Sequence, residues 1–247
     1  MSGWTKGGVK AYVGITRCGK TTLAIKHSRL EAAETRFPIV TLDIGRALSF
    51  AGYPHASGAD EVLYDLYVRR VHPKVWTPPL RCADPKCKHR DIRCAAVAER
   101  AKFWKTLQFH GAAHVLCDEI RHIASHEWIE PAFVEAVTVW GHGRRGPVSY
   151  YITAQRPAFV HRDLWQACDS IYVFKLAPGA DLDRMVHEYG ISPEKNKAFG
   201  RGQCDEVKLG FDDQAKGRRA PAAAGPEGGA DHTPDQGVAD PAAPPAV

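Results

Sequence analysis

The chain has 247 residues, of which 33 are Lys or Arg and 28 are Asp or Glu, so its formal net charge is +5. This length suffices for one α/β domain with a full core, or for one domain with additions. The mildly basic balance permits contact with nucleic acid without requiring it. The first residues lack the apolar run of a secretory signal, and no apolar stretch approaches the roughly 18 residues of a membrane span. Seven cysteines, an odd number, favour a reducing cytoplasm over a disulfide framework.

The first predicted elements are a strand and a helix joined by a glycine-rich turn. Residues 10–15 are apolar and β-rich, and residues 22–36 lack Gly and Pro, as expected of a strand and a helix. Between them lies a complete G-x-x-x-x-G-K-[ST] sequence, which is typical of a phosphate-binding loop. Its glycines let backbone N–H groups point at phosphate oxygens, and the positive end of the helix faces the anion. We therefore predict ATP binding by Gly14, Ile15, Thr16, Arg17, Cys18, Gly19, Lys20, Thr21 and Thr22.

Three side chains of this loop have specific expected roles. Lys20 reaches the β- and γ-phosphates, and the Thr21 hydroxyl binds Mg²⁺. Cys18 lies near Lys20 and the start of a helix, and both features lower a thiol's pKa. We therefore predict that Cys18 is a reactive thiol that bound nucleotide shields.

Apolar runs then alternate with helical stretches along the chain. We predict strands at residues 12–15, 39–44, 114–117, 149–153 and 171–176, and further helices at residues 60–71, 95–109, 131–140 and 181–189. Such alternation implies an α/β fold with a mainly parallel sheet covered by helices on both faces. One domain is expected over residues 1–212, followed by a disordered tail rich in Pro, Ala and Gly over residues 213–247.

Residues 72–94 interrupt this alternation with a basic, Pro-rich insertion. It holds Cys82, Cys87, His89 and Cys94, and three thiolates with one imidazole suit a tetrahedral Zn²⁺ ion. The spacing C-x4-C-x-H-x4-C is not that of a standard zinc knuckle, so two interpretations stay open. One is a zinc-stapled module that presents cations to DNA phosphates. The other is a flexible loop with free thiols.

The strand predicted at residues 114–117 ends in two acids, Asp118 and Glu119. An ATPase with a phosphate-binding loop needs one carboxylate for the Mg²⁺ hydration shell and a second to polarise the attacking water. We assign Asp118 to the metal and Glu119 to the general base. The alternative is a strand that merely ends in acids.

The next predicted strand, at residues 149–153, leads to Gln155. Its amide can donate to the γ-phosphate and accept from the attacking water, so Gln155 is expected to sense hydrolysis. Just upstream, Arg144 and Arg145 lie in a glycine-rich turn, where a guanidinium can act as an arginine finger in a neighbouring subunit. The sequence does not choose between these two arginines, and an ordinary basic surface turn is the alternative.

Together, these motifs resemble the HerA–FtsK superfamily of DNA-pumping ATPases. The resemblance rests on the phosphate loop, the strand ending in Asp118-Glu119, and the Arg–Gly turn before a strand closed by Thr-x-Gln-Arg-Pro. It covers about residues 10–185 and is strongest to the genome-packaging ATPases of internal-membrane icosahedral viruses. Zonula occludens toxin-like phage proteins are relatives.

The resemblance implies a RecA-like P-loop NTPase fold and a working form that is a homo-oligomer, typically a hexameric ring around DNA. It implies Mg²⁺-dependent ATP hydrolysis with catalytic roles for Lys20, Glu119, Gln155 and either Arg144 or Arg145. The expected partners are DNA, in double-stranded form, and a capsid vertex or membrane protein. The expected location is the host cytoplasm or the virion.

The leading expectation is an ATP-driven DNA translocase that packages a viral genome into a preformed capsid. A phage assembly ATPase of the zonula occludens toxin-like kind is one alternative, although such proteins usually carry a membrane span. A P-loop kinase acting on a small molecule is another, although such kinases seldom combine Asp-Glu with a downstream sensor glutamine.

Overall fold

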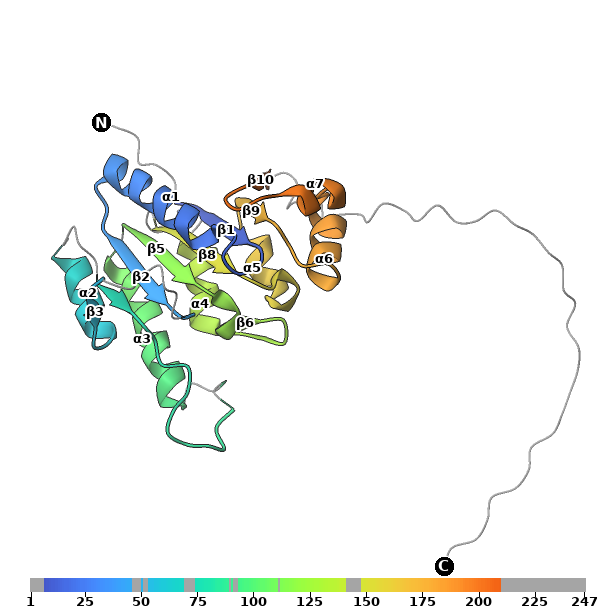
Figure 1. Ribbon diagram of the computed structural model, residues 1–247. Coiled ribbons are helices and arrows are strands. Elements are labelled where there is room, and N and C mark those ends of the chain that lie inside the picture. Colours follow the sequence, from blue (N-terminus) through green and yellow to red (C-terminus); the bar gives the residue numbers. More distant parts are fainter. Residues whose placement is uncertain are drawn as a thin grey trace, which may run out of the picture.

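The computed structural model describes residues 7–45, 50, 53–68, 74–88, 90, 93–110, 112–140 and 148–209 (Figure 1). The predicted tail at residues 213–247 lies outside this part of the chain. No helix among the described residues combines the length and apolar character that a bilayer crossing requires.

A sheet of eight strands forms the centre of the molecule, in the order β10-β9-β1-β8-β5-β2-β4-β3. All neighbouring strands pair in parallel except β10, which is antiparallel to β9 at one edge. The strands are β1 (Val9–Val13), β2 (Ile39–Asp43), β3 (His55–Ala56), β4 (Val75–Trp76), β5 (Ala113–Asp118), β8 (Val148–Ala154), β9 (Ser170–Phe174) and β10 (Cys204–Lys208). A separate hairpin pairs β6 (Ala124–Ser125) with β7 (Trp128–Ile129).

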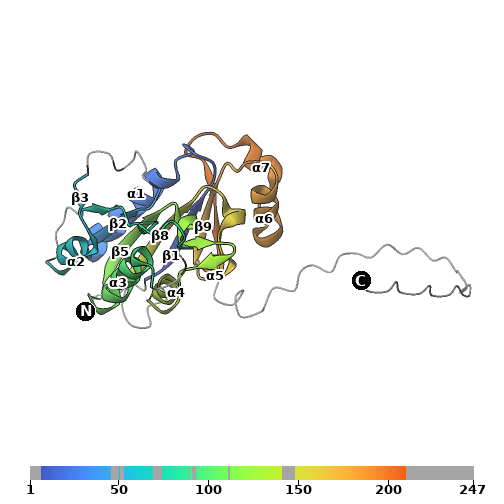
Figure 2. The same ribbon diagram turned by 90° about the horizontal axis from the view of Figure 1, so that it is seen from below.

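Helices cover both faces of the sheet (Figure 2). They are α1 (Lys20–Thr35), α2 (Ala59–Tyr67), α3 (Ala95–His110), α4 (Pro131–Glu135), α5 (Arg162–Gln166), α6 (Ala180–Tyr189) and α7 (Pro193–Ala198). On the α1 face, Tyr12, Leu116 and Tyr151 form one apolar cluster with Ala24 of the helix. On the opposite face a larger cluster includes residues of α2, α3, α4, α5 and α6. This alternation follows from the period of two along a strand.

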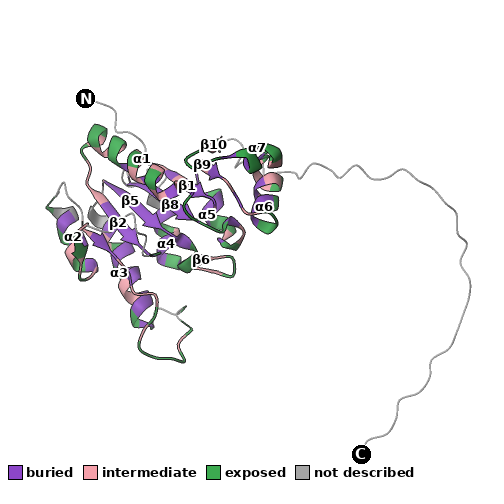
Figure 3. Cartoon of the chain, viewed as in Figure 1, coloured by how far each residue is buried: buried purple, intermediate pink, exposed green. Residues whose placement is uncertain are grey.

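The central strands are buried over their whole length (Figure 3). Every residue of β5 and β8 is buried, because each strand has a neighbour on both sides and helices on both faces. Such strands read as continuous apolar runs. The five strands predicted from the sequence are therefore confirmed, with ends that differ by at most a few residues.

The remaining elements deviate from the predicted pattern in small ways. The helix predicted at residues 131–140 is α4 followed by a π-helical turn, Ala136–Trp140. The helix predicted at residues 60–71 is described over Ala59–Tyr67, and residues 69–71 lie outside the described chain. The short elements β3, β4, α5 and α7 and the edge strand β10 were not predicted.

A buried arginine connects the insertion to the helical layer. Arg100 of α3 donates from Nε to Glu130 Oε2 at 2.8 Å, and both side chains are almost fully buried. The same guanidinium donates to the carbonyl oxygen of Pro79. Val75 and Trp76, at the start of the predicted insertion, form β4 within the sheet. Because α3 runs antiparallel to β5, the described part of the insertion after β4 extends beyond the edge at which the parallel strands end (Figure 1).

Candidate active site

The glycine-rich turn between β1 and α1 is held by the ends of two neighbouring strands. The Gly14 N–H donates to the Ala154 carbonyl at 3.2 Å, and the Ile15 N–H donates to the Lys175 carbonyl at 2.9 Å. Gly14 has a φ of 153°, and a Cβ there would lie 2.7 Å from Phe174 Cβ, so only glycine fits. Gly19, with a φ of 111°, then leads into α1. The loop is thus curled at the carboxyl edge of the sheet, as the phosphate-binding motif predicts.

Lys20, the first residue of α1, folds back over this loop. Its Nζ donates to the Ile15 carbonyl oxygen at 2.8 Å and lies 3.9 Å from Cys18 Sγ. The side chain is only 6% exposed, and the first turn of α1 contains no acid. A cation and the positive end of a helix therefore meet at one place, which suits the binding of phosphate.

Asp118, the last residue of β5, accepts hydrogen bonds from two hydroxyl groups at one carboxylate oxygen. Thr21 Oγ1 donates to Asp118 Oδ1 at 2.9 Å, and Thr153 Oγ1 donates to the same atom at 2.8 Å. Hydroxyl and carboxylate oxygens are the hard ligands that Mg²⁺ prefers. The Thr21–Asp118 corner therefore fits the metal that a bound nucleotide brings.

Glu119 lies beside this corner in a strained backbone conformation. Its φ of 54° is left-handed, and its N–H donates to Thr153 Oγ1 at 3.0 Å. The side chain is 6% exposed, and its Oε1 has no hydrogen-bond partner among the described residues. Arg121 Nε lies 3.7 Å from that oxygen. Burial raises the pKa of Glu119, although Arg121 opposes the shift. A strained, buried acid with an oxygen that accepts no hydrogen bond fits a base that takes a proton from water.

Gln155 follows the end of β8 and contacts the phosphate loop directly. Thr16 Oγ1 donates to Gln155 Oε1 at 2.9 Å. The structure therefore brings the predicted sensor amide to the loop that would hold the γ-phosphate.

Cys18 does not have the surroundings predicted from the sequence. It is 5% exposed and packs with Tyr12, Tyr151 and Phe174 in the apolar cluster under α1. Burial raises the pKa of the Cys18 thiol and outweighs the opposing effect of Lys20. The prediction of a reactive thiol with a lowered pKa is therefore wrong, because it weighed the charges and ignored desolvation.

Three residues near the two acids were given no role in the sequence analysis. Thr153 bonds to both acidic residues, and Asp43, buried at the end of β2, lies opposite Asp118 in the strand register. A Cβ on Gly45 would lie 2.7 Å from Glu119 Cβ, so this position requires a close backbone approach. An acid that ends an apolar strand was a usable signal for Asp43, and Thr153 begins the Thr-x-Gln-Arg-Pro motif, although the sequence assigned it no role. Nothing in the sequence identified Gly45.

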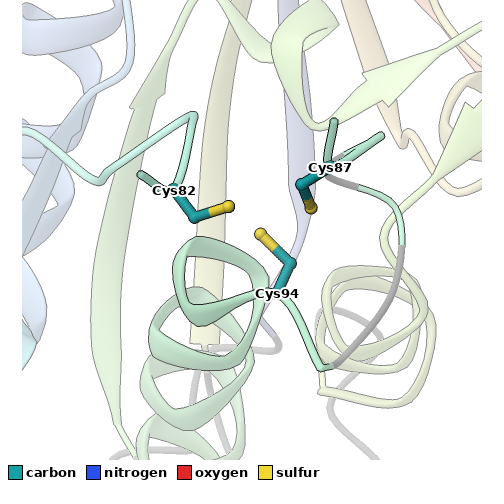
Figure 4. A group of neighbouring side chains, drawn as sticks. All are labelled: Cys82, Cys87 and Cys94. Atoms are coloured by element: carbon teal, nitrogen blue, oxygen red, sulfur yellow. The ribbon is translucent and has the colours of Figure 1, made fainter. Parts of the chain in front are cut away.

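The remaining predicted site residues are the cysteines and histidine of the insertion and the two candidate finger arginines, and the structure describes only the cysteines. Cys82, Cys87 and Cys94 lie together, with their sulfur atoms all within 4.8 Å of one another (Figure 4). His89, Arg144 and Arg145 lie outside the described residues.

Comparison with known proteins identifies the fold. No protein-family model matches the chain, and no curated protein sequence matches it. The genome-packaging NTPase B204 of Sulfolobus turreted icosahedral virus 2, solved with AMP, is similar with a TM-score of 0.61 and 16% identity. That match covers 84% of this chain and 94% of B204. The crystal structure of B204, the DNA-packaging ATPase of Sulfolobus turreted icosahedral virus, gives a TM-score of 0.55 at 15% identity and covers 83% and 98% of the two chains. The chain therefore has the α/β fold of a P-loop NTPase, as the sequence predicts.

Proposed function

We propose that this chain hydrolyses Mg-ATP and uses the reaction to translocate DNA during packaging of a viral genome. The observation that carries the hydrolytic part is the Asp118 corner, where Thr21 of the phosphate loop is bonded to the acid at 2.9 Å beside Glu119. This corner joins the nucleotide loop, a metal-binding carboxylate and a candidate base in one place.

Each side chain of the site has a role in this reaction. Lys20 binds the β- and γ-phosphates, and Thr21 and Asp118 hold the metal. When bound, Mg²⁺ neutralises charge that develops on the phosphate oxygens. Glu119 accepts the proton of the attacking water, so that the bond to the γ-phosphorus forms as the bond to the leaving ADP oxygen breaks. Gln155, bonded to Thr16, reports the departure of phosphate to β8.

The DNA-translocating part is supported by different observations. The motifs resemble the HerA–FtsK superfamily, and the fold is similar to that of an NTPase named for genome packaging over most of both chains. The chain is mildly basic, with a net charge of +5. On this proposal the working form is a hexameric ring of identical subunits around double-stranded DNA. Arg144 or Arg145 completes the neighbouring site, and a capsid vertex or membrane protein docks the ring.

Two other functions make different use of the same site. A small-molecule P-loop kinase transfers the γ-phosphoryl group to an acceptor and must exclude water from the site. A general base such as Glu119 beside the metal corner would activate water, so its placement does not favour a kinase. A phage assembly ATPase of the zonula occludens toxin-like kind hydrolyses ATP without packaging DNA.

The first experiment compares ATP hydrolysis with and without linear double-stranded DNA. Wild-type protein should release phosphate and do so faster with DNA. Lys20→Ala should lose nucleotide binding, while Lys26→Ala, an exposed lysine of the same helix, should not. Glu119→Gln should bind ATP normally but hydrolyse it about 10²–10⁴-fold more slowly. Glu135→Gln, an exposed acid of α4, is its matched control.

The results separate the candidates. Wild-type turnover in Glu119→Gln would remove this residue as the base. Hydrolysis that DNA leaves unchanged would exclude the motor, and ATP consumption that depends on a small acceptor would indicate a kinase. Particles that assemble without the protein but contain no genome indicate packaging, whereas failure of assembly itself indicates the phage-type alternative.

A further inference from the structure

Three cysteines of the insertion converge at the start of α3. Figure 4 shows their side chains pointing toward one another, from two parts of the loop and from the residue before α3. The Sγ atoms of Cys82, Cys87 and Cys94 all lie within 4.8 Å of one another, and none of the three is in a disulfide. In a tetrahedral zinc site with Zn–S bonds of about 2.3 Å, the sulfur atoms are about 3.8 Å apart. A contraction of at most about 1 Å would therefore bring the thiols to ligand distance.

Backbone bonds position these sulfur atoms. The Cys87 N–H donates to the Asp84 carbonyl at 3.2 Å, and the Lys86 N–H donates to Asp84 Oδ1 at 2.9 Å. This turn brings Cys87 back toward Cys82. The Cys94 carbonyl accepts from the Ala98 N–H at 2.9 Å, so Cys94 caps α3 and its sulfur lies at the positive end of the helix. Burial disfavours a free thiolate at Cys94, and a bound cation together with the helix end offsets that cost.

The apolar packing around this loop is small. Cys94 is buried with Ala96 and Val97, and the half-buried Cys82 and Cys87 complete the cluster. The loop also exposes five cations, Arg81, Lys86, Lys88, Arg90 and Arg93. So few apolar contacts cannot offset the entropy of ordering such a polar segment, so a further cross-link would account for its defined turn.

We propose that Cys82, Cys87 and Cys94 bind one structural Zn²⁺ as thiolates and that the ion fastens the insertion to α3. Binding releases the three thiol protons to solvent. A soft, all-sulfur set of three ligands selects zinc over Mg²⁺ or Ca²⁺. A water molecule can supply the fourth ligand. This site is independent of ATP hydrolysis, so it stands or falls separately from the proposed function.

Metal content gives the direct test. Full-length protein purified and dialysed in metal-free buffer should contain about one zinc per chain by elemental analysis. Cys87→Ser should lose most of that zinc, because two thiolates bind far more weakly than three. Cys204→Ser, which removes a half-buried cysteine from the edge strand β10, should keep it.

Two further measurements use wild-type protein, so that the test does not depend on whether the Cys87→Ser variant folds. Replacement of zinc by Co²⁺ should give sulfur-to-cobalt charge-transfer absorption. Trypsin should cut after Lys86, Lys88, Arg90 or Arg93 only once a chelator has removed the metal. Less than about a tenth of a zinc per chain with no cobalt charge-transfer band would overturn the proposal. So would zinc that Cys87→Ser retains in full, or trypsin cleavage that the chelator does not change.

Discussion

Thr153 gives the two adjacent carboxylates of the site different surroundings. Its hydroxyl donates to Asp118 at 2.8 Å and accepts the Glu119 N–H at 3.0 Å. Asp118 therefore receives hydroxyl hydrogen bonds, while the buried Oε1 of Glu119 has no hydrogen-bond partner within the described chain. The Asp118 carboxylate is therefore oriented to bind a cation, while Glu119 has an oxygen that can accept a hydrogen bond from water.

Thr153→Val should impair catalysis more than binding. Valine has the same shape, so packing in β8 is preserved while both hydrogen bonds are lost. We expect kcat to fall about 10- to 100-fold, as for other residues that orient a metal ligand, and the Mg²⁺ concentration for half-maximal activity to rise. The free energy of unfolding should fall by about 1–3 kcal/mol. Steady-state kinetics over a Mg²⁺ series and urea denaturation provide the measurements.

Thr153→Ser is the matched control for this prediction, because it restores the hydroxyl and removes only a methyl group. Activity close to wild type in Thr153→Ser but not in Thr153→Val is the expected pattern. Equal activity in both variants would show that the hydroxyl does not orient the acids.

At the scale of elements, the segment after Gln155 is bonded to the first turns of α6. Arg156 forms an ion pair with the buried Asp181, and the Ala158 N–H donates to the other oxygen of that carboxylate at 3.0 Å. Arg184 of the same helix donates to the carbonyls of Pro157 at 3.1 Å and Val160 at 3.0 Å. A movement of Gln155 away from the phosphate loop would therefore be transmitted to α6.

Asp181→Ala tests this connection. The substitution leaves the Ala158 N–H and the Arg156 guanidinium without their acceptor, so the free energy of unfolding should fall by about 2–4 kcal/mol. kcat should also fall while ATP affinity changes little, because the phosphate loop itself is untouched. Asp183→Ala, at an exposed position in the same turn, should change neither quantity. A loss of stability without a change in kcat would reduce Asp181 to a purely structural residue.

The elements also show which parts of the fold the sequence predicts. The five buried strands were identified because central parallel strands are continuous apolar runs. The edge strand β10, with the sequence Cys-Asp-Glu-Val-Lys, was missed because three of its five residues are charged and it has no apolar run. The five-residue helix α5 is too short to show a helical period.

The candidate site, like the fold, was predicted in part, and the residues that were missed or misread depend on contacts between distant parts of the chain. Lys20, Thr21, Asp118, Glu119 and Gln155 meet as expected, because their motifs end strands that lie side by side in the sheet. The role of Thr153 was missed because it depends on strand register, although the residue lies in the Thr-x-Gln-Arg-Pro motif. Cys18 was misread because burial by Tyr12 and Phe174 cannot be seen in the local sequence.

At the scale of the whole molecule, a ring predicts complementation between two inactive variants. Lys20→Ala cannot bind nucleotide but still carries the arginines, and Arg145→Ala binds nucleotide but cannot complete its neighbour's site. Random mixing in equal amounts places about a quarter of the sites with an intact loop and an intact neighbouring arginine. ATPase activity should therefore appear in the mixture although each variant alone is inactive.

The control for complementation is a mixture in which each subunit is Lys20→Ala or carries both substitutions, and that mixture should remain inactive. The experiment is repeated with Arg144→Ala, since the sequence does not distinguish the two arginines. If neither arginine variant recovers activity with Lys20→Ala, no arginine of this turn acts across a subunit boundary.

The position of β10 has a mechanical consequence. Tension applied to the chain beyond Leu209 would first load the Leu209 N–H bond to the Asp169 carbonyl at 2.8 Å and then the Lys208–Ser170 pair of this strand. An antiparallel edge strand loaded from one end opens one pair at a time, so it resists only a small force. The Gly202 N–H that holds the Cys18 carbonyl at 2.8 Å lies just before β10. A pull on the C-terminal side would therefore peel the whole strand before it disturbed the nucleotide loop, which isolates that loop from small loads.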